Sequence, residues 1–598
     1  MSMSTPRSTV PAQSGGPCVA LSDLSFSWPD GGQVLDRLSA VFSPGRTGLI
    51  GVNGAGKSTL LALIAGRLRP SSGSVTVTGD VGYLPQTLTL DAGARVASLL
   101  GIAGVLDAID AIEAGDTSEA RFDAVGDDWD VRERARGWLS RLGLPHVGLD
   151  DPVGRLSGGE TMMTALTALF LRRPDVLLLD EPTNNLDGDA RGRLRAAVQS
   201  WPGVVLIVSH DRELLALADQ IADLRSDHYG DSLRLYGGNL AAYQAMLEAE
   251  QSAARRAVSA AAADVRREHR DLVRGQTRQA RRDRQGRQLS ASGSLPHAAA
   301  GARQRSAQES AGRSRDTALA RIADAQARLA EAEEAVRDDD AIAISLPGTA
   351  VPAGRTVLRV RGLDGPWMPW RTPADGSADG GAADRGAADR GAIGAADGSR
   401  AIGAADAEAI GELILRGPER IALTGPNGAG KSTLLRLIAG DLEGRERHQP
   451  GLFIRRVDAV GYLPQRLDVL DDTLSVAENV RAVAPAASVN EVRAGLARFL
   501  FRGARADAAA GTLSGGERFR AVLAALLLAE PPPQFLLLDE PTNSLDLASA
   551  RQLSQALACY QGALLVASHD APFLASIGIT RWLRLSGDTR LTEIDPLG

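Results

Sequence analysis

Two nonapeptides, GVNGAGKST at residues 51–59 and GPNGAGKST at residues 425–433, decide what kind of fold this 598-residue chain adopts. Each follows a short apolar stretch and precedes leucines at helical spacing, which predicts a strand, a glycine-rich turn and a helix. Glycines in such a turn let backbone N–H groups point inward around phosphate oxygens at the start of the helix. The two copies therefore predict two phosphate-binding loops.

Lysine occurs at only two positions, Lys57 and Lys431, which are equivalent in the two nonapeptides, although lysine and arginine together number 66. A compact ammonium group reaches the β- and γ-phosphates of a nucleotide, whereas the planar guanidinium of arginine does not fit a narrow loop. If arginine has replaced lysine wherever it is tolerated, these two positions mark where it is not. The hydroxyls that follow, of Ser58 and Ser432, are predicted ligands of Mg²⁺.

The phosphate loops begin a series of five motifs that occurs twice in the same order. The first series is GVNGAGKST, GYLPQ (82–86), LSGGE (156–160), VLLLDEPTNNLD (176–187) and VSHD (208–211). The second is GPNGAGKST, GYLPQ (461–465), LSGGE (513–517), FLLLDEPTNSLD (535–546) and ASHD (567–570). The interval from the LSGGE serine to the SHD histidine is 53 residues in one copy and 55 in the other. The chain therefore contains two tandem units.

The apolar runs around these motifs indicate the fold class. VLLLD and VVLIV are short and continuously apolar, as expected for parallel strands covered on both faces. The predicted fold is thus α/β, with two tandem P-loop domains. We place a flexible segment at 1–17, the first cassette at 18–240, a helical linker at 241–345 and the second cassette at 346–598.

The composition favours a soluble protein in a reducing compartment. It is 44% hydrophobic and 23% charged, and no apolar run reaches the roughly 18–20 residues that a membrane span needs. The polar N-terminal residues contain no apolar segment typical of a secretory signal. Two cysteines, Cys18 and Cys559, form neither a disulfide framework nor a metal cluster. A cytoplasmic location is expected.

The linker carries a concentrated positive charge. Residues 255–315 hold 15 arginines and five acidic residues, whereas the whole chain has a net charge of −7. Helix-forming stretches to about residue 288 and on to Glu334, with a turn at 289–301, predict a helical hairpin. Each arm of about 40 residues would be roughly 60 Å long, although Gly275 and Gly286 argue against one unbroken helix. A polyanionic partner is expected here.

One predicted arm carries its arginines in order. A spacing of three to four residues places several of them on one helical face: Arg267, Arg270, Arg274, Arg278, and Arg281 or Arg282. Such a stripe matches a phosphate backbone and can also stack on bases. A solvated charged face is the alternative, which the small number of acidic partners disfavours.

Residues 371–410 contain GAADRGAADRGAIGAADGSRAIGAAD, with almost no bulky apolar side chain. Such a segment cannot bury enough surface to offset the entropy of ordering it. We therefore expect a disordered insertion within the second cassette.

The acidic ends of the LLLDE runs predict the catalytic groups. Ligands of open α/β sheets gather where the strands end, so Asp180 and Asp539 are expected to hold Mg²⁺, directly or through water. Glu181 and Glu540 would polarise the attacking water, and the SHD histidines, His210 and His569, would orient it. For a lone SHD a strand-end cap is the favoured explanation, but two copies at matched spacing after LLLDE favour catalysis.

LSGGE, standing about twenty residues before LLLDEPTN, resembles the signature of ATP-binding cassette (ABC) ATPases, and the resemblance covers both halves of the chain. It implies ATP and Mg²⁺ as cofactors, and ATP hydrolysis as the activity. It also implies an intramolecular head-to-tail sandwich in which each signature faces the other cassette's phosphate loop. Ser157, Gly158 and Gly159 would face Lys431. Correspondingly, Ser514, Gly515 and Gly516 would face Lys57.

The resemblance also assigns further nucleotide ligands. Gln86 and Gln465 match the Q-loop glutamine, a ligand of Mg²⁺ and water, while Asp187 and Asp546 match the D-loop. Trp28 stands where an aromatic residue stacks on adenine, with a buried core tryptophan as the alternative. The phosphate-loop ligands would be Gly51, Asn53, Gly54, Gly56, Lys57, Ser58 and Thr59, with Gly425, Asn427, Gly428, Gly430, Lys431, Ser432 and Thr433 in the second copy.

Two departures from the family pattern suggest unequal sites. A basic residue usually follows the signature, and the second copy has Arg520 there, but the first has Met163. The second cassette has no clear adenine-stacking residue, because its insertion disrupts that region. Trp367 or Trp370 is a candidate.

The segment YGGNLAAYQAMLEAE (236–250) resembles the exit from the first cassette in the ABC-F group. That resemblance implies a monomeric cytosolic ATPase that binds the ribosome through the arginine-rich linker, with ribosomal RNA as the expected partner and tRNA as a further candidate. It would leave the ribosome after hydrolysis. Members include translation factors and antibiotic-resistance proteins, and the alanine- and arginine-rich composition slightly favours the resistance type. The alternatives are the ATPase subunit of a transporter with a separate membrane protein, or a DNA-binding ABC ATPase.

Overall fold

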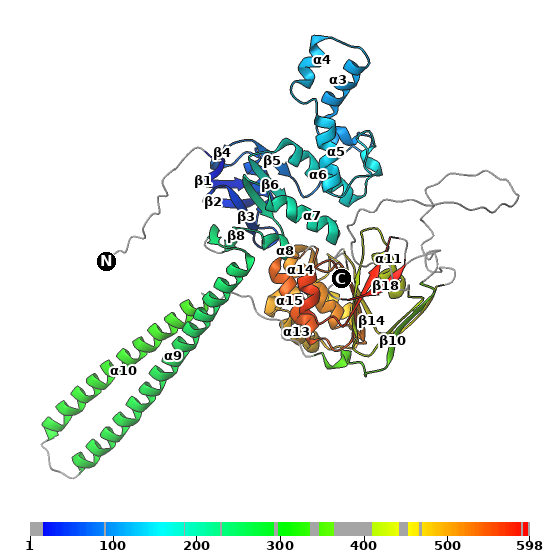
Figure 1. The fold of residues 1–598 in the computed structure, drawn as a ribbon. Coiled ribbons are helices and arrows are strands. Elements are labelled where there is room, and N and C mark those ends of the chain that lie inside the picture. The colour runs from blue at the N-terminus through cyan, green and yellow to red at the C-terminus, as the bar shows by residue number, and fades with distance from the viewer. Residues whose placement is uncertain are drawn as a thin grey trace. The chain divides into compact units, whose positions relative to one another are not determined.

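A computed structural model describes most of the chain (Figure 1). The described residues are 16–88, 91–184, 186–227, 230–291, 297–334, 346–363, 410–441, 452–465, 469–543, 545–587 and 590–595. They form two compact units, Met1–Leu240 with Ala341–Gly598, and Ala241–Asp340. Trp367, Trp370 and all but the last residue of the predicted insertion at 371–410 lie outside the described residues. No helix in the described part of the chain is both long and apolar enough to cross a membrane.

The first cassette is built on a six-stranded sheet in the order β5-β6-β7-β3-β8-β9. Neighbouring strands run parallel, except the antiparallel last pair. In sequence order its strands are β3 (Gly45–Ile50), β5 (Val81–Leu84), β6 (Val176–Asp180), β7 (Val204–Val208), β8 (Gln220–Asp227) and β9 (Gly230–Gly237). A separate antiparallel sheet has the order β2-β1-β4. Its strands are β1 (Cys18–Ser27), β2 (Gln33–Phe42) and β4 (Ser72–Thr78).

The helices of the first cassette connect these strands. They are α1 (Lys57–Ile64), α2 (Val96–Leu99), α3 (Ala103–Glu113), α4 (Glu119–Val125), α5 (Val131–Arg141), α6 (Gly158–Arg172), α7 (Gly188–Gln199), α8 (Arg212–Leu215) and the short 3₁₀ helix η1 (Val153–Arg155). In the described residues, α2 to α5 all lie between Gln86 and the signature.

The second cassette repeats this plan, with a six-stranded sheet in the order β14-β15-β16-β12-β17-β18 and an antiparallel sheet in the order β11-β10-β13. The strands are β10 (Thr356–Arg361), β11 (Glu412–Arg416), β12 (Arg420–Thr424), β13 (Phe453–Arg456), β14 (Val460–Leu463), β15 (Phe535–Asp539), β16 (Ala563–Ala567), β17 (Arg581–Leu585) and β18 (Leu591–Ile594). The helices are α11 (Lys431–Ala439), α12 (Val476–Val483), α13 (Val489–Arg498), α14 (Gly515–Leu527), α15 (Leu547–Cys559), α16 (Ala571–Ser576), and the 3₁₀ helices η2 (Pro347–Thr349), η4 (Gly503–Asp507) and η5 (Ala510–Thr512).

Each six-stranded sheet is covered on both faces, which explains its continuously apolar strands. On β6, Val176 and Leu178 belong to one core cluster, whereas Leu177 and Leu179 belong to another. Strand β15 divides its residues between two clusters in the same way. Burying a leucine or valine side chain contributes about 1.5–3 kcal/mol, so both faces stabilise the sheet. The acidic residue that ends each strand is thereby held in a rigid position.

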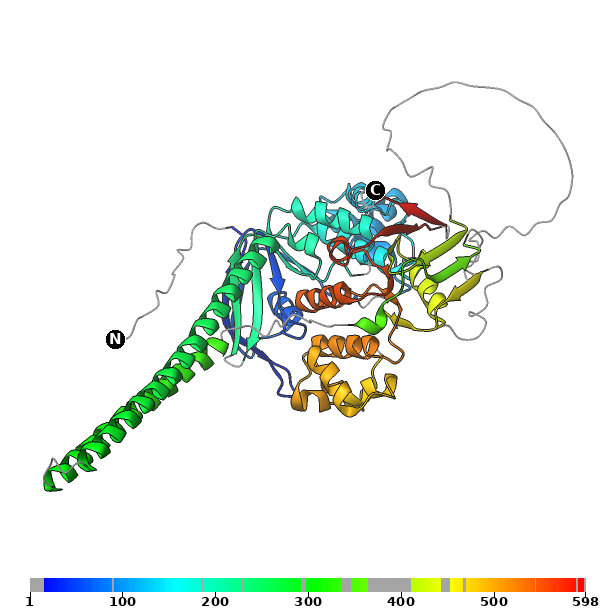
Figure 2. The same cartoon turned by 90° about the horizontal axis from the view of Figure 1, so that it is seen from below.

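The linker forms two long helices, α9 (Leu240–Ala291) and α10 (His297–Glu334). The two views of Figures 1 and 2 show them side by side as a hairpin. A seam of less exposed apolar residues recurs along α10 with alternating spacings of four and three: Ala318, Ile322, Ala325, Leu329 and Ala332. This spacing is typical of helices that pack along their length. The predicted fold, two P-loop cassettes joined by a helical hairpin, is therefore confirmed.

Gly275 and Gly286, which argued against one unbroken helix, do not interrupt the first arm. Helix α9 continues through Gly275 and Gly286 and has 52 residues, so it is about 80 Å long rather than roughly 60 Å. A glycine inside a helix costs only about 1 kcal/mol relative to alanine, which a helix packed against a partner can absorb. The turn is also shorter than predicted, because the helices extend to Ala291 and resume at His297.

Candidate active site

Both phosphate loops lie between a central strand of a six-stranded sheet and the helix that follows it. The loop from β3 leads into α1, which begins at Lys57, and the loop from β12 leads into α11, which begins at Lys431. Each lysine is 7% exposed. Lys57 Nζ donates to the carbonyl oxygens of Gly51 at 2.8 Å and Val52 at 3.1 Å. Both loops thus fold around a buried ammonium group.

The glycines shape these loops. Gly425 has φ of 136°, and a Cβ atom there would lie 2.0 Å from the carbonyl oxygen of Leu585. The equivalent Gly51 would place a Cβ atom 2.4 Å from Leu224 O. Gly56 and Gly430 have left-handed backbone angles at the N-terminus of α1 and α11. Glycine is the residue that adopts such angles at little cost, and at Gly51 and Gly425 a side chain would also clash with the neighbouring strand.

The residues expected to hold a divalent cation are in contact in both cassettes. Ser58 Oγ donates to Asp180 Oδ1 at 3.1 Å, and Ser432 Oγ donates to Asp539 Oδ1 at 3.0 Å. Hydroxyl and carboxylate oxygens are the ligands that Mg²⁺ prefers. Burial is the main cause that raises the pKa of both aspartates. A cation beside a buried carboxylate stabilises its charged form, so the oxygen atoms of these two pairs fit Mg²⁺.

The predicted catalytic glutamates directly follow the buried strands. Glu181 and Glu540 have φ of 48° and 45°, a left-handed conformation that is rare for residues other than glycine. Strain of roughly 1–3 kcal/mol of this kind is concentrated at functional sites. The backbone N–H of Glu181 donates to Val208 O at 2.8 Å, which ties it to the neighbouring strand. The position of the Glu181 carboxyl group is therefore fixed through the neighbouring strand of the sheet.

Each glutamate lies beside the predicted histidine. His210 Nε2 is 3.3 Å from Glu181 Oε1, and His569 Nε2 is 3.6 Å from Glu540 Oε1. Burial raises the pKa of Glu181 to about 8 and that of Glu540 to about 7. Burial likewise lowers the pKa of His210 to about 4 and of His569 to about 3. A carboxyl group that titrates near neutral pH beside a neutral imidazole suits proton exchange with water.

Several of these buried polar atoms have no hydrogen-bond partner in the described residues: Glu181 Oε1, His210 Nδ1 and Glu540 Oε2. Buried polar atoms are almost always paired in proteins, so exceptions indicate a functional role. These atoms converge on the end of the sheet where the phosphate loops lie. They are therefore placed to bind water or phosphate oxygens.

The first signature and the second phosphate loop line one cavity of about 510 Å³. Its signature residues are Ser157, Gly158 and Gly159. From the second cassette it is lined by Asn427, Gly428, Gly430, Lys431, Ser432, Thr433, Gln465, Glu540 and His569. Cavities of about 300–1,000 Å³ are typical of ligand sites. Lys431 has one more contact here, with Nζ 2.9 Å from His569 Nε2.

The second signature meets the first phosphate loop by direct contact. A Cβ atom on Gly515 would lie 3.6 Å from Cβ of Asn53. Gly516 lies near the Asp546 carboxylate, which in turn accepts a 3.4 Å hydrogen bond from the Asn53 backbone. The head-to-tail arrangement expected from the family resemblance is thus present at both loops.

Both signature serines are also structural caps. Ser157 begins α6 and Ser514 begins α14, each in a capping box with the glutamate three residues later. Such a cap stabilises a helix by about 1 kcal/mol. The cap uses the backbone N–H of Glu160 and of Glu517, and the helix N-terminus carries a partial positive charge that favours an anion nearby.

Other predicted residues differ in exposure. Trp28 is 44% exposed and packs edge-on against Phe26 at 5.0 Å, so it is not the buried core residue that we considered as an alternative. The Gln86 backbone N–H bonds the Asp180 carboxylate, while its side chain is exposed. Met163 is buried, and Thr59 is half-buried. Arg520 lies 5.6 Å from the ring of Phe501 within its own cassette.

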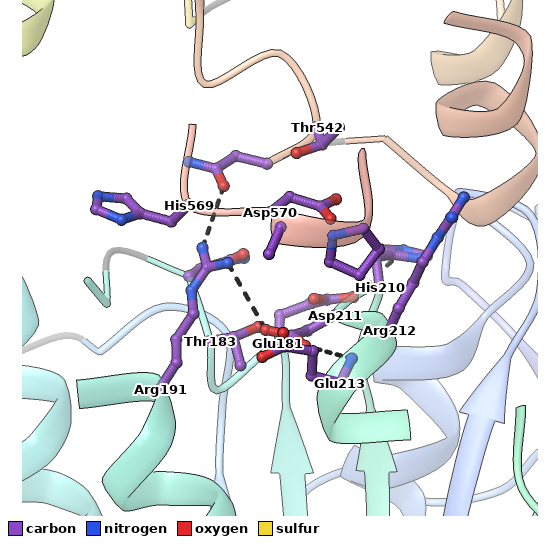
Figure 3. A pocket seen from close by; sticks show the side chains of 14 residues that line it. Glu181, Thr183, Arg191, His210, Asp211, Arg212, Glu213, Thr542, His569 and Asp570 are labelled. Carbon is purple, nitrogen blue, oxygen red and sulfur yellow. Dashed lines mark hydrogen bonds and ion pairs between the residues drawn. The ribbon is translucent and has the colours of Figure 1, made fainter. Parts of the chain in front are cut away.

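A charged cluster between the two cassettes was not predicted from the sequence (Figure 3). Arg191 of α7 contacts Asp211, which follows His210, and Asn543 of the second cassette. The signal was present in the sequence: NNLDGDAR in the first copy corresponds to NSLDLASA in the second. Only a position-by-position comparison of the two D-loops would have drawn attention to Arg191.

Comparisons with known proteins agree with this geometry. The family model for the ABC transporter domain matches residues 35–184 and 412–543. The chain is 33% identical over 565 residues to the Tylosin resistance ATP-binding protein TlrC of Streptomyces fradiae, covering 90% of this chain and 92% of TlrC. It is 30% identical over 558 residues to the Probable ATP-binding protein YheS of Escherichia coli K12, covering 91% and 75%.

A third relative is the Energy-dependent translational throttle protein EttA of Escherichia coli K12, 29% identical over 576 residues and covering 91% of this chain and 88% of EttA. These alignments extend across both cassettes and the helical linker. The family model alone marks only the cassettes. The chain is therefore an ATPase that belongs to the ABC-F subfamily of ATP-binding cassette proteins.

Proposed function

We propose that this ATPase binds the ribosome while its two cassettes are closed on two Mg·ATP, and leaves the ribosome after hydrolysis. The observation that carries the ribosomal part is the exposed arginine row on α9: Arg267, Arg270, Arg274, Arg278 and Arg281. A row of guanidinium groups along a helix can pair with the row of phosphates along an RNA backbone, whereas an apolar partner would leave these charges unpaired.

The charge of this row is only partly neutralised within the linker. Arg267 pairs with Asp264 at 3.1 Å and Arg274 pairs with Asp271 at 3.7 Å, both on the same helix. Exposed pairs of this kind contribute little, about 0–1 kcal/mol. With 15 arginines against five acidic residues at 255–315, the segment keeps a large positive potential. Counterion release on binding RNA would then supply much of the affinity.

The nucleotide part of the proposal assigns a role to each predicted residue. Lys57 and Lys431 bind the β- and γ-phosphates, while the Ser58–Asp180 and Ser432–Asp539 pairs, with Gln86 and Gln465, hold Mg²⁺. The metal neutralises charge on the phosphates. Glu181 and Glu540 polarise the attacking water, and His210 and His569 orient it. Trp28 stacks on adenine in the first cassette.

The relatives support the proposed setting. EttA is named as a translational throttle, and TlrC is named for tylosin resistance. The proposal therefore covers two roles, regulation of translation in the cytoplasm or protection of the ribosome against an antibiotic. Both roles use the same ATP-dependent binding, so one experiment tests their common step.

The test is co-sedimentation of the Glu181→Gln, Glu540→Gln double variant with purified 70S ribosomes, with and without ATP. This variant should bind ATP without hydrolysing it, so we expect it to pellet with ribosomes only when ATP is present. Replacing Arg270, Arg274 and Arg278 by Gln in the same background should weaken binding and reduce its dependence on salt concentration.

A matched control comes from the same helix. Arg255, Arg266 and Arg284 are also exposed, and they lie about a quarter of a turn around α9 from the row. Their triple replacement removes the same charge and should weaken binding less. If both triple replacements weaken ribosome binding equally, the net charge of the helix determines binding and the position of the arginines in the row does not. Absence of ribosome binding in every condition would refute the proposal and direct attention to DNA or to a membrane partner.

A further inference from the structure

The two D-loops differ at a position that faces the opposite cassette. Four residues after Asp187 stands Arg191, whereas four residues after Asp546 stands Ala550. Both D-loop aspartates cap the following helix in the same way, Asp187 at α7 and Asp546 at α15. The two helices therefore share the same cap but differ in the residues that follow it, GDAR at 188–191 and LASA at 547–550, and Arg191 is the basic residue among them.

Arg191 is 12% exposed and is held by three groups. Its Nε donates to Leu186 O at 3.1 Å, and Nη2 donates to Asn543 Oδ1 at 3.4 Å. Nη1 lies 3.6 Å from Oδ2 of Asp211, which is itself buried. Figure 3 shows Arg191 extending toward the side chains of His569 and Asp570 of the second cassette. The side chain thus bridges the two cassettes.

Asn543 belongs to the turn that carries the second catalytic glutamate. Its backbone N–H donates to Glu540 O at 3.2 Å, closing the turn in which Glu540 has its left-handed φ of 45°. Asn184 closes the same turn at Glu181 in the first cassette, also at 3.2 Å. Arg191 thus donates a hydrogen bond to Asn543, in the turn at Glu540. Ala550, at the equivalent position of the second cassette, has no side-chain donor for Asn184, in the turn at Glu181.

Arg191 also lies at the second nucleotide cavity. It lines that cavity with Lys431 and Glu540, and it interacts electrostatically with Glu540 and His569. A buried cation this near a reacting carboxyl group affects where that group is held as well as its charge. The first cassette thereby contributes to the second site a group that Ala550, at the equivalent position of the second cassette, cannot contribute in return.

We propose that Arg191 is a positioning residue supplied in trans to the second ATP site, where it fixes the Asn543–Glu540 turn when the cassettes close. The two ATP sites of this chain are therefore not equivalent: hydrolysis at the second site requires contact with the first cassette through Arg191. This inference rests on the proposed role of Glu540.

The test measures each site separately, without ribosomes. In the Glu181→Gln background only the second site turns over, and Arg191→Ala should lower kcat there by about 10-fold while KM changes by less than about 2-fold. In the Glu540→Gln background only the first site turns over, and the same substitution should change kcat by less than about 2-fold. Arg191→Lys, which keeps a charged donor, should restore part of the second-site rate.

The control is Arg195→Ala, one turn further along α7, where Arg195 pairs with Glu213 of its own cassette. It should leave kcat at both sites unchanged. If Arg191→Ala lowers the melting temperature, Asn543→Ala provides an independent variant. It should reproduce the second-site loss, and combining the two should add little, because both remove one interaction.

Equal losses at both sites, or no loss at the second site, would overturn the inference. So would additive effects of Arg191→Ala and Asn543→Ala. A Glu540→Gln variant that retains full turnover at the second site would contradict the role of Glu540 itself, which is a distinguishable result. Ribosome binding does not enter any of these measurements.

Discussion

The backbone N–H of Asn53 lies 3.4 Å from Oδ2 of Asp546, so the first phosphate loop meets the second D-loop directly. Asp546 Oδ1 accepts from Ser549 N at 2.8 Å and caps α15. One carboxylate thus starts a helix in the second cassette and contacts the nucleotide loop of the first. The Asp546 side chain therefore links closure of the cassettes to order in the first loop.

This closure can be captured by a disulfide. A Cβ atom on Gly515 would lie 3.6 Å from Cβ of Asn53, within the range of about 3.5–4.5 Å that a disulfide needs. In a Cys18→Ser, Cys559→Ser background, the Asn53→Cys, Gly515→Cys pair should therefore oxidise readily, and ATP should speed the reaction. The bridge would alter mobility on a non-reducing gel.

The control for this cross-link pairs Asn53→Cys with Gly158→Cys, the signature position that faces the other loop. A Cβ atom on Gly158 would have no heavy atom of another residue within 4 Å, so a cysteine there should not bridge to residue 53. Similar bridging by both pairs would mean that collisions, rather than the head-to-tail contact, explain the reaction.

Replacing a phosphate-loop lysine by arginine should abolish turnover at that site. Lys431 Nζ lies within 3.2 Å of Gly425 O, Pro426 O and His569 Nε2, a set of contacts that suits a compact ammonium group rather than a planar guanidinium. In the Glu181→Gln background, Lys431→Arg should lower kcat/KM by about 100-fold or more, measured by phosphate release. Arg436→Lys, at an exposed position on α11, should have no effect. Retained activity in Lys431→Arg would contradict the interpretation of the lysine-poor composition.

Removing Trp28 should weaken nucleotide binding at the first site. The indole is 44% exposed, and stacking a base on an aromatic ring contributes about 1–3 kcal/mol. In a Lys431→Ala background, Trp28→Ala should therefore raise the Kd for a fluorescent ATP analogue by about 10-fold. Trp129, which is 49% exposed and lies between α4 and α5, provides the control. If Trp129→Ala has the same effect, Trp28 has no specific role.

The sequence predicted those parts of the fold that depend on a few neighbouring residues. Apolar strands, glycine turns and acidic strand ends are properties of a few neighbouring residues, and both cassettes follow from them. The length of α9 was underestimated because the helix already begins at Leu240, within the segment at 236–250 that precedes the predicted arm, and continues to Ala291. Gly275 and Gly286 do not interrupt it, since packing along a helical seam outweighs their low helix propensity. Arg191 was missed because its significance depends on Asn543, which is 352 residues away.

The burial of the two lysines also affects chemical labelling. Apart from its α-amino group, the chain has no other primary amine, and burial lowers the pKa of both Lys57 and Lys431. A lowered pKa raises the fraction of reactive, unprotonated amine at neutral pH. An acylating reagent followed by peptide mass spectrometry would therefore report the occupancy of each nucleotide site separately, in the unmodified protein and on the same sample.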